Sequence, residues 1–292
     1  EILRKIVNDL KAAKDLLAKC DTIKENKHWM STENRMLAVN SGTSGELAKD
    51  VFFAYRGYRM NYYAVTAMLA RVYCWAGEYG NAYKEAKEVV DATYSTGSTS
   101  TASCFNFSNS LTTNRKDYNS IIMTFFKSTC YEDYLPYMTK GNDVVLVVNT
   151  TNLFGDEAGA DDRNLDLFGD WDGGDIKYSF KYDIKEGTSG TDMIPAIRLS
   201  EMYYIMGEYF AYKDEFSKAG EMLDKVRYAR GISTTNLASS IGSLEVFHTH
   251  LIKEMRREFV GEGQMFFQYK RLDQKPKDNV VFVFDKPNNE DI

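Results

Sequence analysis

The stretch RMNYYAVTAMLARVYCWAGEYGNAYKEAKEVVDA, residues 59–92, contains two helical patterns joined at AGEYG. Small and bulky residues alternate at the positions that would face a partner helix: Leu69, Ala70 and Tyr73 before the turn, then Tyr79, Ala82, Ala86 and Val89 after it. Small alanines allow two antiparallel helices to approach closely, while the tyrosines fill the space around them. The stretch therefore predicts a helical hairpin at about 58–93.

The same spacing returns in IPAIRLSEMYYIMGEYFAYKDEFSKAGEMLDKVRYARGI, residues 194–232. It predicts a second hairpin at about 194–231, and both copies are typical of tetratricopeptide (TPR) repeats. More than 100 residues separate the copies, so no continuous solenoid is expected. With an amphipathic helix at the start of the chain, these patterns predict one mainly α domain over residues 1–292, with TPR-like hairpins, long irregular loops and a few short strands.

The composition excludes several classes of function. A net charge of -6 gives no electrostatic reason to expect nucleic-acid binding. Three histidines without HExxH, four scattered cysteines and the absence of GxSxG indicate no metal, no cofactor and no catalytic residue. Aromatic residues, at 14%, include 20 tyrosines, which suit half-wet surfaces that bind sugar-like faces. A recognition surface is therefore expected.

A loop-rich region at about 94–193 separates the hairpins, with strand-like runs at 120–128 and 142–150. Loop regions of this length are usually functional. The segment GDWDGGD offers a Trp face with hydrogen-bonding groups at its edge, although a Trp buried in the local core is an equal alternative. We expect a ligand to be bound by loop residues Trp171, Tyr178, Tyr134, Tyr137 and Asp172. The acidic run at 156–175 lacks calcium-loop spacing, so a solvated loop is favoured there.

A C-terminal helix is expected at about 244–273, and it places Glu254, Glu258 and Glu262 in one i,i+4 row. Like charges at this spacing repel, so the row needs nearby cations. Arg257 on the same helix and Arg198, Arg227 and Arg230 on the second hairpin are the candidates. A glycosidase carboxylate pair is the alternative, but arginines would lower both pKa values and leave no general acid. A structural ion network is favoured, and Gly261 and Gly263 are expected to let a helix or ring approach the backbone.

Several of these segments together resemble the C-terminal signature of SusD/RagB-type glycan-binding lipoproteins of the Bacteroidetes outer membrane. In that family, motifs like IPxIRxxE, D/NKVR…RGI and ErRREfxgEGxxxxxxKR follow in order. The matching positions are Pro195, Arg198, Glu201, Asp224, Arg227, Arg230, Gly231, Glu254, Arg257, Glu258, Glu262, Gly263, Lys270 and Arg271. The run DDRN at 161–164 is similar to a further family element, D-x-R. The lipidated cysteine of the family is absent, so we expect a fragment with the middle and C-terminal parts.

The resemblance implies a SusD-like helical scaffold whose variable loops bind a glycan at the cell surface. It also implies an outer-membrane location through an N-terminal lipid, no catalysis, and delivery of the glycan to a SusC-like TonB-dependent transporter. The residues themselves leave a TPR-type protein adaptor open as the alternative function, with a glycoside hydrolase as a third. The sequence does not name the glycan, because family binding sites are built from variable loops.

Overall fold

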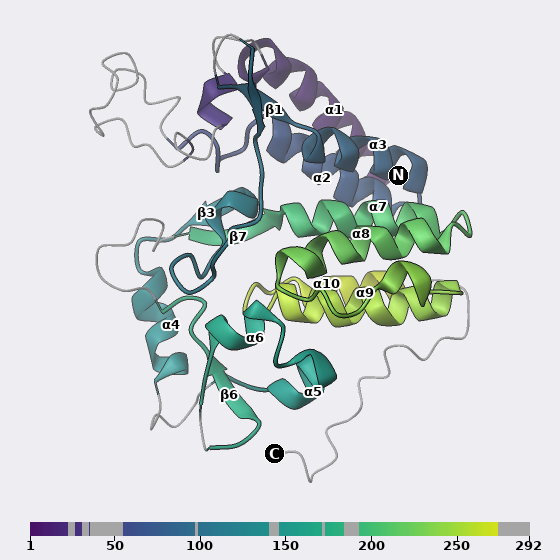
Figure 1. Cartoon of the computed structure of the whole chain (residues 1–292). Coiled ribbons are helices and arrows are strands. Elements are labelled where there is room, and N and C mark those ends of the chain that lie inside the picture. Colours follow the sequence, from purple (N-terminus) through teal and green to yellow (C-terminus); the bar gives the residue numbers. More distant parts are fainter. Residues whose placement is uncertain are drawn as a thin grey trace.

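Helices stacked in layers form most of the protein (Figure 1). The computed structural model describes residues 1–22, 27–30, 35, 55–96, 99–139, 146–170, 173–183 and 193–273. From the N-terminus, the layers are α1, the α2–α3 hairpin, the α7–α8 hairpin, and the pair α9 and α10. The bounds of these helices are α1 Ile2–Asp21, α2 Tyr62–Trp75, α3 Tyr79–Val90, α7 Leu199–Ala211, α8 Phe216–Ala229, α9 Leu244–Glu258 and α10 Met265–Asp273. The expected mainly α fold with two TPR-like hairpins is confirmed.

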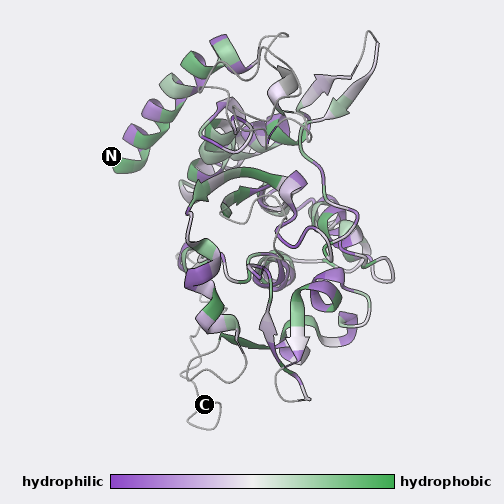
Figure 2. Ribbon diagram, turned by 90° about the vertical axis from the view of Figure 1, so that its left-hand side faces the viewer, coloured by the Kyte–Doolittle hydropathy of each residue, from purple (hydrophilic) through white to green (hydrophobic). Residues whose placement is uncertain are grey.

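Local sequence explains the first hairpin. The side chain of Asn61 caps α2 by accepting a hydrogen bond from the backbone N–H of Ala64 at 2.9 Å. Gly77, with φ of +75°, turns the chain between the two helices. Ala82 and Ala86, the small residues expected at the helix contact, are fully buried. Helix α1 packs on α2 and covers the hairpin. Hydrophilic and hydrophobic residues alternate along α1 in Figure 2, as expected for a helix with one face on the protein and one face in solvent.

The central helix α7 belongs to two hydrophobic cores. Met202 and Ile205 pack into the core shared with α2 and α3. Tyr204 and Ala211 pack into the core shared with α8, α9 and α10. Because α7 is covered on both sides, its sequence is apolar around most of its circumference.

Among the described residues, three small antiparallel sheets accompany the helices. The bounds of their strands are β1 Thr93–Ser95 with β2 Thr101–Ser103, β3 Ile121–Phe126 with β7 Met193–Arg198, and β4 Val147–Asn149, β6 Ile176–Ser179 and β5 Phe168–Asp170 in that order. Strands β3 and β4 lie within the two strand-like runs that the sequence indicates. The IPAIR segment is strand β7, so the helix of the second hairpin begins only at Leu199.

The loop-rich region also contains short helices that periodicity did not indicate. They are too short to show an amphipathic repeat in the sequence. Their bounds are α4 Cys130–Met138, α5 Thr150–Phe154 and α6 Asp162–Leu167. The same region contains the 3₁₀ turns η4 Tyr118–Ser120 and η5 Gly155–Glu157, and the turns η1 Lys27–Met30 and η6 Leu237–Ser239 lie outside it.

The helix expected at 244–273 is divided into α9 and α10. Gly261 and Gly263 cause the break, since their φ angles of +73° and +69° lie in the left-handed region that a helix does not use. A Cβ atom on Gly261 would lie 3.3 Å from the ring of Tyr182. The expected close approach of a ring is therefore confirmed at Gly261 but is wrong for Gly263, where a Cβ atom would meet nothing within 4 Å.

Candidate functional site

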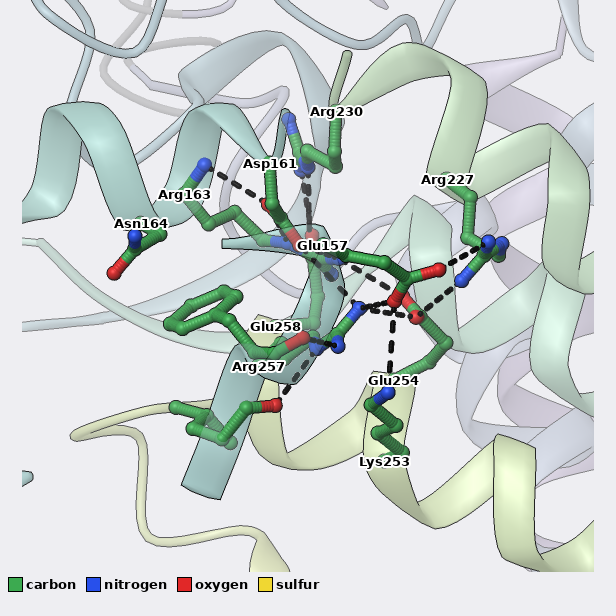
Figure 3. A network of polar contacts seen from close by, with 12 residues as sticks. Glu157, Asp161, Arg163, Asn164, Arg227, Arg230, Lys253, Glu254, Arg257 and Glu258 are labelled. Atoms are coloured by element: carbon green, nitrogen blue, oxygen red, sulfur yellow. Dashed lines mark hydrogen bonds and ion pairs between the residues drawn. The ribbon is translucent and has the colours of Figure 1, made fainter. Parts of the chain in front are cut away.

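The carboxylate row of α9 lies at the centre of a buried ion cluster (Figure 3). Glu258 accepts from Arg230 at 2.5 Å and from Arg163 at 3.2 Å. Glu254 lies 3.2 Å from Arg227 and 3.0 Å from Arg257. Three of the four expected arginines, Arg227, Arg230 and Arg257, therefore pair with Glu254 or Glu258, and Arg163 joins them.

Glu262 does not continue the helical row as expected, because α9 ends at Glu258 and places Glu262 in the turn before α10. It lies 2.5 Å from Arg198 Nη2 and 2.6 Å from Lys181 Nζ. Lys181 also donates to the carbonyl oxygen of Glu258 at 2.8 Å. This lysine follows β6, so it connects the three-stranded sheet to the helices.

Two acids from the run expected to be a solvated loop belong to the same cluster. Glu157 lies 2.7 Å from both Arg227 and Arg257. Asp161 lies 2.8 Å from Arg163 and is fully buried. The expectation of a solvated loop is wrong for these two residues, because ion pairs with arginines of α6, α8 and α9 hold them in the cluster.

The electrostatics of the cluster oppose acid catalysis. Burial alone would raise the pKa of Glu258, but Arg230, Arg163 and Arg198 hold that pKa well below its ordinary value. Burial likewise acts to raise the pKa of Glu157, while Arg227 and Arg257 lower it by more. The space enclosed beside Glu258 measures about 10 Å³, enough for about one water molecule. These carboxylates have neither a proton to give nor room for a sugar.

Sequence periodicity missed Arg163, which lies on α6, 91 residues from Glu254. Its guanidinium group contacts Asp161, Glu254 and Glu258. The signal that could have found it is the DDRN run, where Asp161 caps α6 by accepting from the backbone N–H of Arg163. The ion cluster holds α5 and α6 against α8 and α9, and we call it the joint.

Ion pairs to α7 also hold the helical layers together. Arg71 of α2 donates to Glu201 of α7 at 2.5 and 2.6 Å. Arg271 of α10 donates to both carboxylate oxygens of Glu208 of α7 at 2.7 Å. Bidentate pairs of this kind fix the relative orientation of two helices as well as their distance.

The residues expected to bind a ligand are only partly within the described segments. Trp171 and Asp172 lie outside them. Tyr178 is half-buried on β6, opposite Val147 of β4 and Gly169 of β5. A Cβ atom on Gly169 would lie 2.5 Å from the ring of Phe180 and 2.7 Å from that of Tyr178. Gly169 therefore gives these two rings the space to lie across β5.

Tyr137 lies on α4, beside the same sheet. Its carbonyl oxygen accepts from the backbone N–H of Leu146 at 2.9 Å, and Val147, the next residue, pairs with Tyr178. Tyr137, Leu146 and Val147 are 44%, 57% and 43% exposed. Together with Tyr178 and Phe180, these three residues form what we call the aromatic strip.

Tyr134 has a different environment from Tyr137, although both belong to α4. Its ring stacks on Tyr182 with centroids 4.2 Å apart and planes 11° apart. Its hydroxyl donates to the carbonyl oxygen of Gly261 at 3.3 Å. One face of Tyr134 is thus engaged at the turn between α9 and α10.

Neither a metal centre nor a membrane span is found in the part of the chain that the structure describes. No three His, Cys, Asp or Glu side chains there are grouped so that they could hold a metal ion. No helix among those residues is both long and apolar enough to cross a membrane.

Comparison with known proteins agrees with this architecture. The model of the SusD family matches residues 53–286. A SusD superfamily protein from Bacteroides thetaiotaomicron VPI-5482 is 24% identical, with a TM-score of 0.53, over 73% of this chain and 50% of its own. Another from the same organism has a TM-score of 0.60 at 18% identity, over 85% of this chain and 57% of its own.

The surface glycan-binding protein A from Bacteroides uniformis has a TM-score of 0.56 at 16% identity, over 93% of this chain and 57% of its own. The chain thus spans about half the length of these structures, and a comparison with curated proteins gave no match. At these identities the solved structures show the fold alone, whereas the family model matches most of the sequence. The resemblance carried by the IPAIR, DKVR and EMRREFVGEG segments is therefore confirmed, and the chain belongs to the SusD family.

Proposed function

We propose that this protein binds a glycan through the aromatic strip, without catalysis. The observation that carries the proposal is the half-buried Tyr178 ring, which lies with Phe180 over Gly169 and next to exposed residues of β4 and α4. An aromatic face with a polar hydroxyl at its tip suits the apolar CH face and the hydroxyls of a sugar ring. The relatives described as sugar-binding or glycan-binding support this choice of ligand.

Trp171 and Asp172 belong to the same proposal through their place in the chain. They directly follow Asp170, the last residue of β5, and β5 pairs with β6 so that Gly169 is opposite Tyr178. We propose that Trp171 supplies a second sugar platform and Asp172 a hydrogen-bond acceptor, while Tyr134 and Tyr137 extend the surface along α4. Weak contacts at several rings would add up on a polymer, because each further contact is intramolecular.

We propose that the protein captures the glycan without cleaving it, and the burial of Glu254 and Glu258 supports this. Glu254 and Glu258 are 1% and 3% exposed, and arginines surround both. A TPR-type protein adaptor remains the alternative, but it needs an open helical groove. The faces of α7 that would line such a groove pack into two hydrophobic cores, which weighs against the adaptor.

We further propose that the loaded protein delivers its glycan to a SusC-like TonB-dependent transporter at the outer membrane, and that an N-terminal lipid holds it at the cell surface. Family membership supports this proposal. Co-purification of the protein with such a transporter, in the presence and absence of glycan, would test it. Failure to co-purify under both conditions would count against the partnership.

Affinity gel electrophoresis tests the glycan proposal. Wild-type protein, Tyr178→Ala and Trp171→Ala would be run through gels containing soluble starch, xylan, yeast mannan or pectin. At least one polysaccharide should retard the wild type, and each variant should bind it about three- to tenfold more weakly, as expected for loss of one aromatic contact. The control is Tyr228→Ala, which removes an exposed tyrosine from α8.

Two results would contradict the proposal. One is a wild type that no polysaccharide retards. The other is equal retardation of the wild type and both variants, which would separate glycan binding from the strip and from Trp171. Release of sugar products from any of the four polysaccharides would instead support an enzyme.

A further inference from the structure

A second aromatic surface lies at the turns of the two hairpins. Helix α7 begins next to β7 and ends at Ala211, so its far end is separated from the β3–β7 sheet by the length of the helix (Figure 1). At that end, α3 and α7 pack side by side and form a groove of about 440 Å³. The groove is shallow and open to solvent.

Tyrosines from both hairpins line the groove. Tyr79, the first residue of α3, stacks on Tyr212, which follows α7, with ring centroids 4.0 Å apart and planes 15° apart. Tyr209 forms another part of the wall, and its ring stacks on Tyr83 at 4.4 Å. All four tyrosines are half-buried. Each ring is covered on one face by its stacking partner, and the stacks fix the positions of the rings relative to one another.

Polar groups surround these rings. Asn81 donates to Glu78 at 2.7 Å, and both side chains are at the exposed rim. Lys213 lies over the ring of Tyr209, 5.1 Å from its centroid, and donates to its hydroxyl at 3.2 Å. An amide, a carboxylate and an ammonium group next to aromatic rings are the groups that bind sugar hydroxyls around a stacked ring.

The floor of the groove is open because of the turn sequence. Gly77 and Gly80 both line it, and a Cβ atom on either would meet nothing within 4 Å. Gly77 has a φ of +75°, so the turn requires it. Gly80, the second residue of α3, has no such requirement, since no left-handed φ is found there. The groove therefore contains a helical glycine that backbone geometry does not explain.

We propose that this hairpin-turn groove is a second glycan-binding site, which takes one sugar ring against the Tyr79, Tyr209 and Tyr212 wall. The proposal rests on the glycan-binding function proposed above, and adds a site on a different part of the protein. Two sites at separate ends of the molecule would bind one polysaccharide chain more tightly than either does alone.

Gly80→Leu tests the groove without removing any packed side chain. Leucine at position 80 fills the open floor and favours the helix, so the thermal midpoint should stay the same or rise. In affinity electrophoresis with soluble starch, xylan, yeast mannan and pectin, the variant should bind the polysaccharide that retards the wild type about three- to tenfold more weakly. The matched control is Glu221→Leu, which adds the same side chain at an exposed position of α8 and should bind as the wild type does.

A second comparison separates the two proposed sites. The variant Trp171→Ala with Tyr178→Ala should retain part of the retardation, and adding Gly80→Leu should abolish it. Unchanged binding by both Gly80→Leu and Tyr209→Ala would overturn the groove proposal while leaving the glycan function standing. Retardation of the wild type by none of the four polysaccharides would overturn both.

Discussion

The ion cluster around α9 is buried, whereas the aromatic strip beside β6 is partly exposed to solvent. In the cluster, Glu258 is 3% exposed and accepts from two guanidinium groups. In the strip, Tyr137 is 44% exposed on α4. Reciprocal ion pairing balances the charges of the cluster and leaves space for about one water. The strip has exposed apolar surface, which is why we propose it as a ligand-binding region.

The two regions should also differ in how strongly a substitution changes the free energy of folding. Removing one partner from a buried ion pair leaves an uncompensated charge, whereas removing an exposed ring costs little folding free energy. Substitutions in the cluster should therefore change stability, and substitutions in the strip should change binding. The following expectations test that division, from the largest effect to the smallest.

Glu258→Ala should lower the free energy of unfolding by about 3–5 kcal/mol, because Arg230 and Arg163 lose their shared carboxylate. Chemical denaturation at neutral pH would measure the change. The matched control, Glu221→Ala, removes an exposed carboxylate from α8 and should stay within about 0.5 kcal/mol of the wild type. Equal stability of Glu258→Ala and wild type would break the distinction between the two regions.

Acid should destabilise the protein through the same carboxylates. The folded-state pKa values of Glu258 and Glu157 lie below the ordinary value of 4.5, because arginines outweigh the opposite effect of burial. Their stabilisation is therefore fully present well above pH 4.5 and is lost as the pH falls below it. Urea midpoints measured between about pH 7 and pH 3 should fall steeply in the wild type and less steeply in Glu258→Gln. Parallel slopes for the two proteins would show that Glu258 does not hold its charge in this way.

Gly231→Ala should weaken the contact between α8 and α6. Gly231 has a φ of +84°, and a Cβ atom there would lie 2.7 Å from the carbonyl oxygen of Ala160 and 2.8 Å from a carboxylate oxygen of Asp162. Strain of this kind costs about 1–3 kcal/mol. Gly242→Ala is the control, since a Cβ atom at Gly242 meets nothing within 4 Å, and its thermal midpoint should match the wild type. A wild-type midpoint for Gly231→Ala would mean that α6 moves away from α8 without cost.

The cluster could be predicted from the sequence largely because it obeys a local rule. Carboxylates at i,i+4 spacing repel one another and need cations nearby, and Arg227, Arg230 and Arg257 pair with Glu254 or Glu258. Arg163 and Glu157 were missed, since no periodicity connects residues about 90 to 100 positions apart. The spacing of carboxylates in the sequence shows that cationic partners are needed, but the tertiary fold decides which distant residues those partners are.

The aromatic strip was harder to predict for a related reason. Aromatic composition indicates that a recognition surface exists, but a ring's exposure depends on which strand or helix lies beside it. Tyr178 owes its position to Gly169 on the neighbouring strand. Tyr137 lies near Tyr178 only because Leu146 is hydrogen-bonded to α4. The assignment of Trp171 and Asp172 to the site stays a prediction from the sequence.

Tyr134 and Tyr137 allow the same comparison within the single helix α4. Tyr134→Ala removes a ring stacked on Tyr182 and a hydrogen bond to Gly261, so it should lower stability by about 1–2 kcal/mol. Tyr137→Ala removes an exposed ring and should stay within about 0.5 kcal/mol of the wild type. Thermal unfolding and affinity electrophoresis, run on both variants, would measure the two effects separately.

Because both residues lie on one nine-residue helix, helix propensity and substitution are the same in the two variants, and only the environment of the ring differs. Weaker glycan binding by Tyr137→Ala at wild-type stability would place ligand contact on the exposed side of α4. If Tyr137→Ala instead lost stability while Tyr134→Ala did not, the exposed ring would be part of the packing and the stacked ring would not. The division between a joint that holds the fold and a surface that binds glycan would then fail on this helix.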